Sequence, residues 1–331
     1  MDKPLLSVRN LTLDIPVGGG TLHAVRGIDF DLRRGETLCI VGESGSGKSL
    51  TSLALMGLLG KTIKRSADEM TFDGIDLTRA NPRTMRSLRG ARMAMIFQEP
   101  MTSLNPAYTI GDQLTEALLL HKSVGREAAR ARAVELLEKV GITAAASRLS
   151  QYPHQLSGGL RQRVMIAMAL MCEPELIIAD EPTTALDVTI QAQILRLLYD
   201  LGREMNMAMI LITHDLGVVA RVADKVAVMY AGELVETGSA TEVFNTPSHP
   251  YTRGLLRCIP QPGKTERGST LGTIPGIVPS LIGDVTGCAF RTRCPHATLE
   301  CRGDIPRHTT GGHAFRCIHA DGKLHAEEAT A

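Results

Sequence analysis

Gly42-Glu43-Ser44-Gly45-Ser46-Gly47-Lys48-Ser49 decides the fold, because it matches the phosphate-binding pattern G-x-x-x-x-G-K-[ST] at every fixed position. The apolar run 38–41 before it predicts a buried strand, and the Leu-, Ala- and Met-rich run 50–59 predicts a helix. The glycines let backbone N–H groups turn toward phosphate oxygens at the positive end of that helix. Lys48 is placed to reach the outer phosphates, and the Ser49 hydroxyl to bind Mg²⁺. A Gly/Ser-rich linker is the alternative, but such linkers are not bracketed by strand and helix patterns. The sequence therefore predicts a nucleoside triphosphate site.

The composition is that of a globular chain with no membrane-spanning segment. Hydrophobic residues make up 44% of the 331 residues and charged residues 21%, and the formal charge of +1 gives no overall attraction to nucleic acid. No apolar run approaches the ~18 residues of a membrane span, and the N-terminus lacks a signal-peptide pattern. We expect a cytosolic chain that reaches a membrane only through a partner. In that compartment the seven cysteines favour thiols or a metal site over disulfides.

The apolar patterns predict an α/β fold with a parallel core sheet, an antiparallel flank and an inserted helical subdomain. Alternating apolar residues on both sides of a glycine turn at 18–20 predict the antiparallel flank. Continuous apolar strands such as 176–179 are typical of a parallel sheet. Helical spacing at Ala133, Leu136, Leu137 and Val140 places the helical subdomain at about 100–160.

The composition changes beyond residue 240 toward Pro, Gly, Arg and His, and this part holds five of the seven cysteines. We therefore expect a nucleotide-binding domain over residues 1–240. Residues 241–331, here called the C-terminal segment, are expected to form a separate, small and irregular module.

Four polar residues follow predicted strands and could serve the chemistry of phosphate cleavage. Gln98 could reach the metal or its water, and the Asp180 carboxylate could hold Mg²⁺. Glu181 could polarise an attacking water, and the imidazole of His214 could contact a γ-phosphate. Each residue taken alone is more often structural. Their fixed order after the phosphate loop makes the set specific.

A second candidate anion site lies at Leu156-Ser157-Gly158-Gly159-Leu160, just before a predicted long helix. Ser157, Gly158 and Gly159 would present a hydroxyl and backbone donors at the helix N-terminus. Asp187 follows the Asp180 strand within the run Ala185-Leu186-Asp187.

Over residues 5–240 this arrangement resembles the ATP-binding cassette (ABC) ATPases. The resemblance implies ATP and Mg²⁺ as cofactors, and two cassettes packed head to tail so that each ATP lies between one phosphate loop and the other cassette's signature. By resemblance the site residues are the Walker A loop 42–49, the Q-loop Gln98, the signature 156–160, the Walker B strand 176–180, the catalytic Glu181, the D-loop 185–187 and the switch His214. Two positions depart from the family pattern. Leu160 replaces the commoner glutamine, and Ile15, Leu22 or His23 stands where an aromatic residue usually stacks on adenine.

Further motifs resemble the dipeptide, oligopeptide and nickel importer branch of this family. They are the stretch Met95–Pro106, His249-Pro250-Tyr251-Thr252, Ile274-Pro275-Gly276 and Gly287-Cys288. The resemblance implies an ATPase subunit at the cytoplasmic face of the inner membrane, peripheral to two permeases. Its other partners would be a second, non-identical cassette and an extracytoplasmic binding protein. Peptides, nickel and other small solutes stay open as substrates. A soluble ABC ATPase of translation or DNA repair is the alternative function, but it usually carries two cassettes or a long coiled-coil insertion, and neither is present.

Cys288, Cys294, Cys301 and Cys317 are the candidate ligands of an inorganic centre, because their flanks are polar and rich in turns. Their spacing lacks the close C-x₂₋₄-C pair of structural zinc and suits a larger cluster such as [4Fe–4S]. Nearby histidines keep a mixed zinc site open, and unligated thiols remain the third alternative. Cluster-bearing relatives in the dipeptide-importer branch favour the first.

Overall fold

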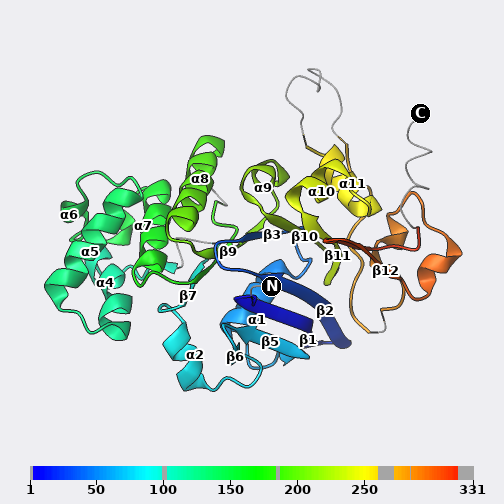
Figure 1. Ribbon diagram of the computed structural model, residues 1–331, viewed down its shortest axis with the longest axis horizontal. Helices are drawn as coiled ribbons and strands as arrows, with labels where there is room; N and C mark the ends of the chain where they lie inside the picture. Colours follow the sequence, from blue (N-terminus) through cyan, green and yellow to red (C-terminus); the bar gives the residue numbers. More distant parts are fainter. Residues whose placement is uncertain (1–2, 99–102, 184–186, 260–271, 284, 320–331) are drawn as a thin grey trace.

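The computed structural model describes residues 3–98, 103–183, 187–259, 272–283 and 285–319. Two sheets form the body (Figure 1). Helices α8 to α11 cover one face of the larger sheet, and helix α1 lies with the smaller sheet on its other face. A group of helices, α4 to α7, stands at one end, and residues 285–319 of the C-terminal segment stand at the other. Within the described residues, no helix has both the length and the apolar character needed to span a membrane.

The larger sheet has eight strands in the order β12-β13-β11-β10-β3-β9-β8-β7. Pairing is parallel from β10 through β3, β9 and β8 to β7, as predicted for the core sheet, and antiparallel from β10 to β12. The strands are β3 (Thr37–Val41), β7 (Met93–Ile96), β8 (Leu176–Asp180), β9 (Ala208–Thr213), β10 (Lys225–Tyr230), β11 (Glu233–Ser239), β12 (Arg307–Thr310) and β13 (His313–Arg316).

The smaller sheet is the predicted antiparallel flank. Its order is β2-β1-β5-β6, and β4 pairs with β1 beside this path. A two-residue glycine turn joins β1 to β2, which confirms the predicted hairpin. The strands are β1 (Leu6–Val17), β2 (Gly20–Leu32), β4 (Lys64–Ser66), β5 (Glu69–Phe72) and β6 (Ile75–Asp76).

The long helices lie where apolar spacing predicts them. Short helical turns of three or four residues (α6, η1, η2 and η3) occur in the less regular parts of the chain. Helix α5 is followed by Gly141 at a φ of +78°, the left-handed conformation that favours glycine after a helix end. The helices are α1 (Lys48–Met56), α2 (Pro82–Leu88), α4 (Ile110–His121), α5 (Arg126–Lys139), α6 (Ala145–Arg148), η1 (Pro153–Gln155), α7 (Gly158–Leu170), α8 (Val188–Glu204), α9 (Leu216–Val222), α10 (Ala240–Asn245), α11 (Pro250–Arg257), η2 (Ala289–Thr292) and η3 (Leu299–Arg302).

Strand β3 carries the phosphate loop from the centre of the core. Its five residues are all buried. Leu38 and Ile40 pack with α1 and the smaller sheet, while Cys39 and Val41 pack with the helices of the opposite face. Because both faces are covered, the strand reads as one continuous apolar run, and the loop that follows it starts from a rigid base.

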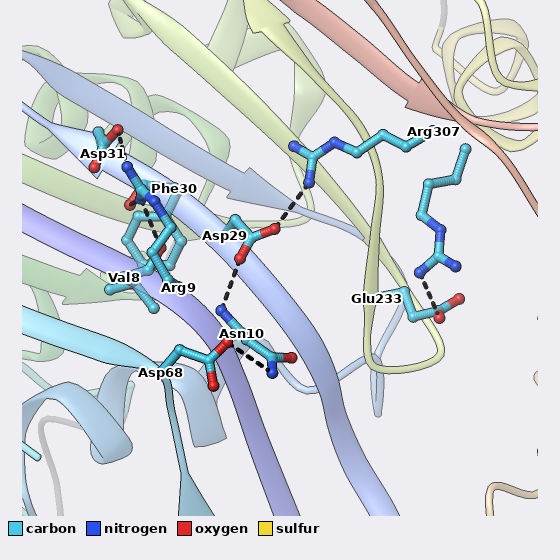
Figure 2. Close-up of polar contacts among 10 residues, drawn as sticks. Val8, Arg9, Asn10, Asp29, Phe30, Asp31, Asp68, Glu233 and Arg307 are labelled. Atoms are coloured by element: carbon cyan, nitrogen blue, oxygen red, sulfur yellow. Dashed lines mark hydrogen bonds and ion pairs between the residues drawn. The ribbon is translucent and has the colours of Figure 1, made fainter.

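The C-terminal segment, which its composition marks as a distinct part of the chain, is joined to the body by strand pairing and hydrogen bonds. Strand β13 pairs with β11 of the larger sheet. Glu236 on β11 is fully buried and accepts hydrogen bonds from the backbone N–H groups of Ser248 (2.7 Å) and His249 (2.9 Å), at the start of α11. Arg307 of β12 reaches Asp29 of β2 at 2.9 Å (Figure 2). The compositional change at 240 therefore marks a new kind of sequence but no break in the sheet.

Two arginines that follow helix α2, Arg89 and Arg92, make contacts with other elements of the fold. Arg89 donates to the Met56 and Gly57 carbonyl oxygens, both at 2.7 Å, at the C-terminal end of α1. Arg92 pairs with Asp73 and Glu175. These two side chains fasten the phosphate-loop helix and the smaller sheet to the core.

Candidate nucleotide site

The phosphate loop needs glycine at two positions where the chain runs against backbone. A Cβ on Gly42, whose φ is +155°, would lie 2.0 Å from the Met229 carbonyl oxygen. A Cβ on Gly47, whose φ is +105°, would lie 2.5 Å from the Ala24 carbonyl oxygen. Gly47 also caps α1 without a side-chain hydrogen bond, so the first-turn N–H groups of α1 remain available to an anion. The loop geometry therefore fits phosphate.

Lys48 lies inside this loop with its ammonium group directed at the loop's own carbonyl groups. Its Nζ donates to the Gly42 oxygen at 2.8 Å and to the Glu43 oxygen at 2.9 Å. The residue is only 5% exposed, and this burial lowers the pKa of the ammonium, against the opposing effect of nearby carboxylates. A buried cation held by weak neutral acceptors is poised to exchange them for phosphate oxygens.

Ser49 and Asp180 meet as predicted for a Mg²⁺ site. The Ser49 hydroxyl donates to Asp180 Oδ1 at 2.9 Å, which brings the first turn of α1 to the end of β8. Burial raises the pKa of Asp180, and the hydrogen bond from Ser49 partly offsets that rise. A hydroxyl and a carboxylate oxygen together with phosphate oxygens and waters are the usual ligands of Mg²⁺ beside a nucleotide.

Glu181 lies at the centre of the residues expected to act on the γ-phosphate. Its Oε2 accepts a hydrogen bond from Gln98 Nε2 at 3.1 Å, and Nδ1 of His214 is 3.6 Å from the same oxygen. The latter distance exceeds a hydrogen bond, so His214 stands beside the carboxylate with 68% of its side chain exposed. The backbone of Glu181 has a φ of +43°, unusual for a residue other than glycine, and its N–H donates to the Ile212 oxygen at 2.9 Å. The fold thus holds Glu181 in a backbone conformation that residues other than glycine rarely adopt.

The signature residues lie apart from these groups, at the start of α7 in the helical region (Figure 1). Ser157 caps α7, and its Oγ accepts from the Leu160 N–H at 3.4 Å. Ser157 and Gly158 are exposed, so the second predicted anion site faces outward. Asp187 caps α8 by accepting from the Ile190 N–H at 3.0 Å. Ala185 and Leu186 of the predicted D-loop lie outside the described residues, as do Glu99 to Thr102 of the predicted Q-loop.

The three residues at the expected adenine position are not equivalent. Leu22 packs against the core and forms a β-bridge with Ile282 of the C-terminal segment, while Ile15 packs against the smaller sheet. His23 keeps about a third of its side chain exposed and contacts Asp14 at 2.7 Å. Only His23 offers a planar ring there.

The four candidate cysteines of the C-terminal segment line one enclosed cavity of about 10 Å³, together with His249, His296 and His319. Three short pieces bring them there: Cys288 caps η2, Cys301 is in η3, and Cys317 follows β13. All four thiols are free. Cys301 and Cys317 are less than a tenth exposed, although their flanking sequence is polar and rich in turns.

The donor set fits a four-thiolate centre, but the side chains do not take up ligand geometry. Within the described part of the chain, no three His, Cys, Asp or Glu side chains stand close enough to hold one metal ion. Burial raises the pKa of the Cys294 thiol to about 11, and it also raises those of Cys288 and Cys317. These thiols are therefore protonated at neutral pH, and any metal binding would have to displace their protons.

Comparison with known proteins agrees with this geometry. Residues 25–184 match the ABC transporter family, and residues 235–301 match the C-terminal region of oligopeptide and dipeptide transporters. The dipeptide transport ATP-binding protein DppD of Bacillus subtilis is 51% identical over 320 residues, covering 96% of this chain and 95% of that protein. The chain belongs to the ATP-binding proteins of ABC transporters. DppD of Escherichia coli is also 51% identical, over 91% of this ABC protein and 92% of its own length.

Solved ABC cassettes share the fold of this ABC ATPase. The dimeric cassette MJ0796 in a post-hydrolysis state with ADP and phosphate aligns with a TM-score of 0.64 and 27% identity. The alignment covers 71% of this chain and 98% of that one. CbiO1 of Clostridium perfringens gives a TM-score of 0.62 at 29% identity and covers 74% of this chain and 92% of its own. The α/β cassette fold predicted from the sequence is confirmed.

Two contacts of the phosphate loop were not predicted from the sequence. The Glu43 side chain pairs with Arg293, and the Glu43 N–H donates to the Tyr251 hydroxyl. Tyr251 lies within the run His249-Pro250-Tyr251-Thr252, a motif that resembles the importer branch but that nothing in the sequence connects to the phosphate loop. No sequence motif marks Arg293, because a lone arginine beside a cysteine does not indicate a contact with a loop 250 positions earlier in the chain.

Proposed function

We propose that this chain is one of two ATP-hydrolysing cassettes of a membrane importer for dipeptides or similar small solutes. The observation that carries the proposal is the division of the site. Lys48, Ser49, Asp180 and Glu181 converge on one phosphate loop, while the signature Ser157 faces outward. A complete ATP site then needs the signature of a second cassette. The solved relative MJ0796 is itself a dimer with ADP and phosphate, which supports this arrangement.

In the proposed mechanism, Lys48 leaves the loop carbonyls to bind the outer phosphates. Ser49 and Asp180 would hold Mg²⁺, which would offset the negative charge of the phosphates. Glu181 accepts a proton from the attacking water, with Gln98 orienting its carboxylate and His214 beside the γ-phosphate. The partner's signature stabilises the phosphate from the other side. ATP binding closes the two cassettes and hydrolysis reopens them, which drives the permeases.

The names of the relatives support a peptide substrate. DppD proteins are dipeptide transport ATP-binding proteins, and the match to the oligopeptide and dipeptide transporter C-terminal region includes Tyr251 and three of the four candidate cysteines. We propose two permeases, a second and non-identical cassette, and an extracytoplasmic binding protein as partners. The chain would lie peripherally at the cytoplasmic face of the inner membrane. We also propose that residues 1–240 form the nucleotide-binding domain and that residues 241–331 form an extension packed against it.

The test is the ATPase rate of the purified chain, titrated against its own concentration, then with the second cassette and the permeases. The lone chain should hydrolyse ATP slowly, because its phosphate loop lacks a partner signature. Addition of the other subunits should raise the rate. Full activity from dilute monomer would contradict the proposal, since the site would then be complete within one chain.

We also propose that Cys288, Cys294, Cys301 and Cys317 hold a [4Fe–4S] cluster, with zinc as the alternative. The convergence of four free thiols on one cavity supports it. The cavity that the thiols line would have to widen, because a cavity of about 10 Å³ holds no more than one water. Such a cluster would supply a one-electron redox group and would cross-link three pieces of chain.

Metal analysis of anaerobically purified protein tests this site. The cluster predicts a brown protein, broad absorbance near roughly 400 nm and about four irons per chain, all lost in Cys294→Ser. Cys258→Ser is the matched control, because Cys258 is in the same segment but bonds to the Gly254 oxygen away from the cavity. Colourless protein with one zinc per chain would replace the cluster by zinc, and protein without metal would reject both.

A further inference from the structure

The second residue of the phosphate loop is held by the C-terminal segment. Arg293 Nη1 lies 2.9 Å from Glu43 Oε2, an ion pair between groups 250 positions apart in the sequence. The Glu43 backbone N–H donates to the Tyr251 hydroxyl at 3.0 Å. The Glu43 carbonyl oxygen is one of the two acceptors of Lys48. One residue thus joins the C-terminal segment to the nucleotide-binding lysine.

The side chains of Arg293 and Tyr251 are each held in place by groups other than the phosphate loop. The Arg293 side chain is 4% exposed and also donates to the Pro275 oxygen at 2.9 Å and to the Ile274 oxygen at 3.1 Å. Tyr251 is fully buried, and its ring centre lies 4.6 Å from that of Tyr230. Packing and hydrogen bonds on several sides leave these groups little freedom, so they can restrain the loop.

Phe290 extends the same packing to the cysteine cavity. Its ring centre lies 5.4 Å from that of Tyr251 and 5.2 Å from that of Tyr230, and the Arg293 guanidinium lies 5.9 Å from it. Phe290 also lines the cavity of the four cysteines. The restraint on the phosphate loop is therefore anchored in the part of the C-terminal segment that carries the cysteines.

We propose that Arg293 and Tyr251 are positioning residues of the nucleotide site and that the C-terminal segment sets its affinity for MgATP. Together they fix the side chain and the N–H of Glu43, so the loop is arranged before nucleotide arrives and less order must be gained on binding. Both residues act through Glu43, and we propose no direct contact between either of them and ATP. Their loss should weaken MgATP binding and leave turnover at saturating ATP nearly unchanged.

The test is a double-mutant cycle on the full chain, with the dissociation constant of MgATP measured by titration calorimetry. Arg293→Gln should raise that constant by about three- to tenfold, allowing for the partial exposure of Glu43. In a Glu43→Gln background the same substitution should have little further effect, because the ion pair is already gone. Arg291→Gln is the matched control. It removes the same charge two residues earlier in the chain, within η2, but Arg291 donates to the Thr286 and Cys288 oxygens instead of the loop.

A Tyr251→Phe variant covers the case in which Arg293→Gln fails to fold, because it removes only the hydroxyl that accepts from Glu43. It should also raise the MgATP dissociation constant, and turnover in the assembled transporter should show a higher KM with an unaltered kcat. Wild-type affinity in both variants would overturn the proposal, as would an Arg293→Gln effect of full size in the Glu43→Gln background. The inference rests on the nucleotide site proposed above. Absence of MgATP binding by the wild-type chain would reject that site, whereas normal binding with no effect of the variants would reject only the positioning role.

Discussion

Replacing Glu181 by glutamine removes the proposed general base while keeping the shape of the side chain. The amide oxygen of glutamine can still accept the hydrogen bond that Gln98 donates at 3.1 Å, and the backbone N–H contact to Ile212 is unaffected. The backbone strain at a φ of +43° is the same for either residue. The substitution therefore changes the proton acceptor and little else.

The expected loss follows from that single change. A positioned general base contributes roughly 10²–10⁴ in rate, equivalent to about 3–5 kcal/mol of activation free energy. Steady-state ATPase activity of the assembled transporter should fall by that factor. MgATP binding, for which Lys48 and Ser49 are the proposed contacts, should persist. The Glu181→Gln cassettes should then accumulate in the ATP-bound, closed state.

Glu173→Gln is the matched control for this experiment. Glu173 also has a left-handed backbone, with a φ of +54°, but its carboxylate is exposed and pairs with Arg132 at 2.9 Å. This control should retain wild-type turnover. Near wild-type turnover in Glu181→Gln would refute the assignment of Glu181 as the base.

Three further predictions concern the loop, the metal site and the fold. Ser49→Ala removes a proposed Mg²⁺ ligand, so the Mg²⁺ concentration for half-maximal ATPase activity should rise several-fold; an unchanged requirement would argue against that ligand. Gly47→Ala places a Cβ 2.5 Å from a carbonyl oxygen at a φ of +105°, and urea unfolding should show a loss of at least about 1 kcal/mol. Gly45→Ala, with no atom within 4 Å of its Cβ, should cost less, and equal costs would contradict the steric argument. Hydrogen bonding to Arg92 holds the pKa of Glu175 below its ordinary value of 4.5. The pair therefore stabilises the fold above pH 4.5, and this contribution to the free energy of unfolding is lost as pH falls through the lowered pKa. In Glu175→Gln the urea midpoint should be lower at pH 7 and should fall less steeply on acidification; a wild-type acid profile would exclude the pair as the cause.

The sequence predicted the parts of the site whose signals are local. Continuous apolar strands end at the phosphate loop, at Asp180 and at His214, and parallel strands bring such ends to one edge of a sheet. The contact between Ser49 and Asp180 follows from that geometry. The outward position of the signature followed from the family resemblance, and the cap of α7 by Ser157 is consistent with it.

The parts that could not be predicted depend on contacts between distant, irregular segments. Composition changes at residue 240, yet strand pairing continues from β11 to β13 because backbone hydrogen bonds do not depend on side-chain type. The burial of Cys301 and Cys317 comes from the packing of loops whose sequence has no periodicity. The pair between Glu43 and Arg293 is set by the tertiary fold alone, and neither residue signals the other.

Uptake of a labelled dipeptide by proteoliposomes tests the central claim most directly. The vesicles would hold this chain with its second cassette and both permeases, with MgATP inside and the binding protein outside. The account predicts uptake that requires internal ATP and stops in the Glu181→Gln variant while the Glu173→Gln variant transports normally. Undiminished uptake in the Glu181→Gln variant, or ATP hydrolysis that the loaded binding protein does not stimulate and that moves no peptide, would contradict it.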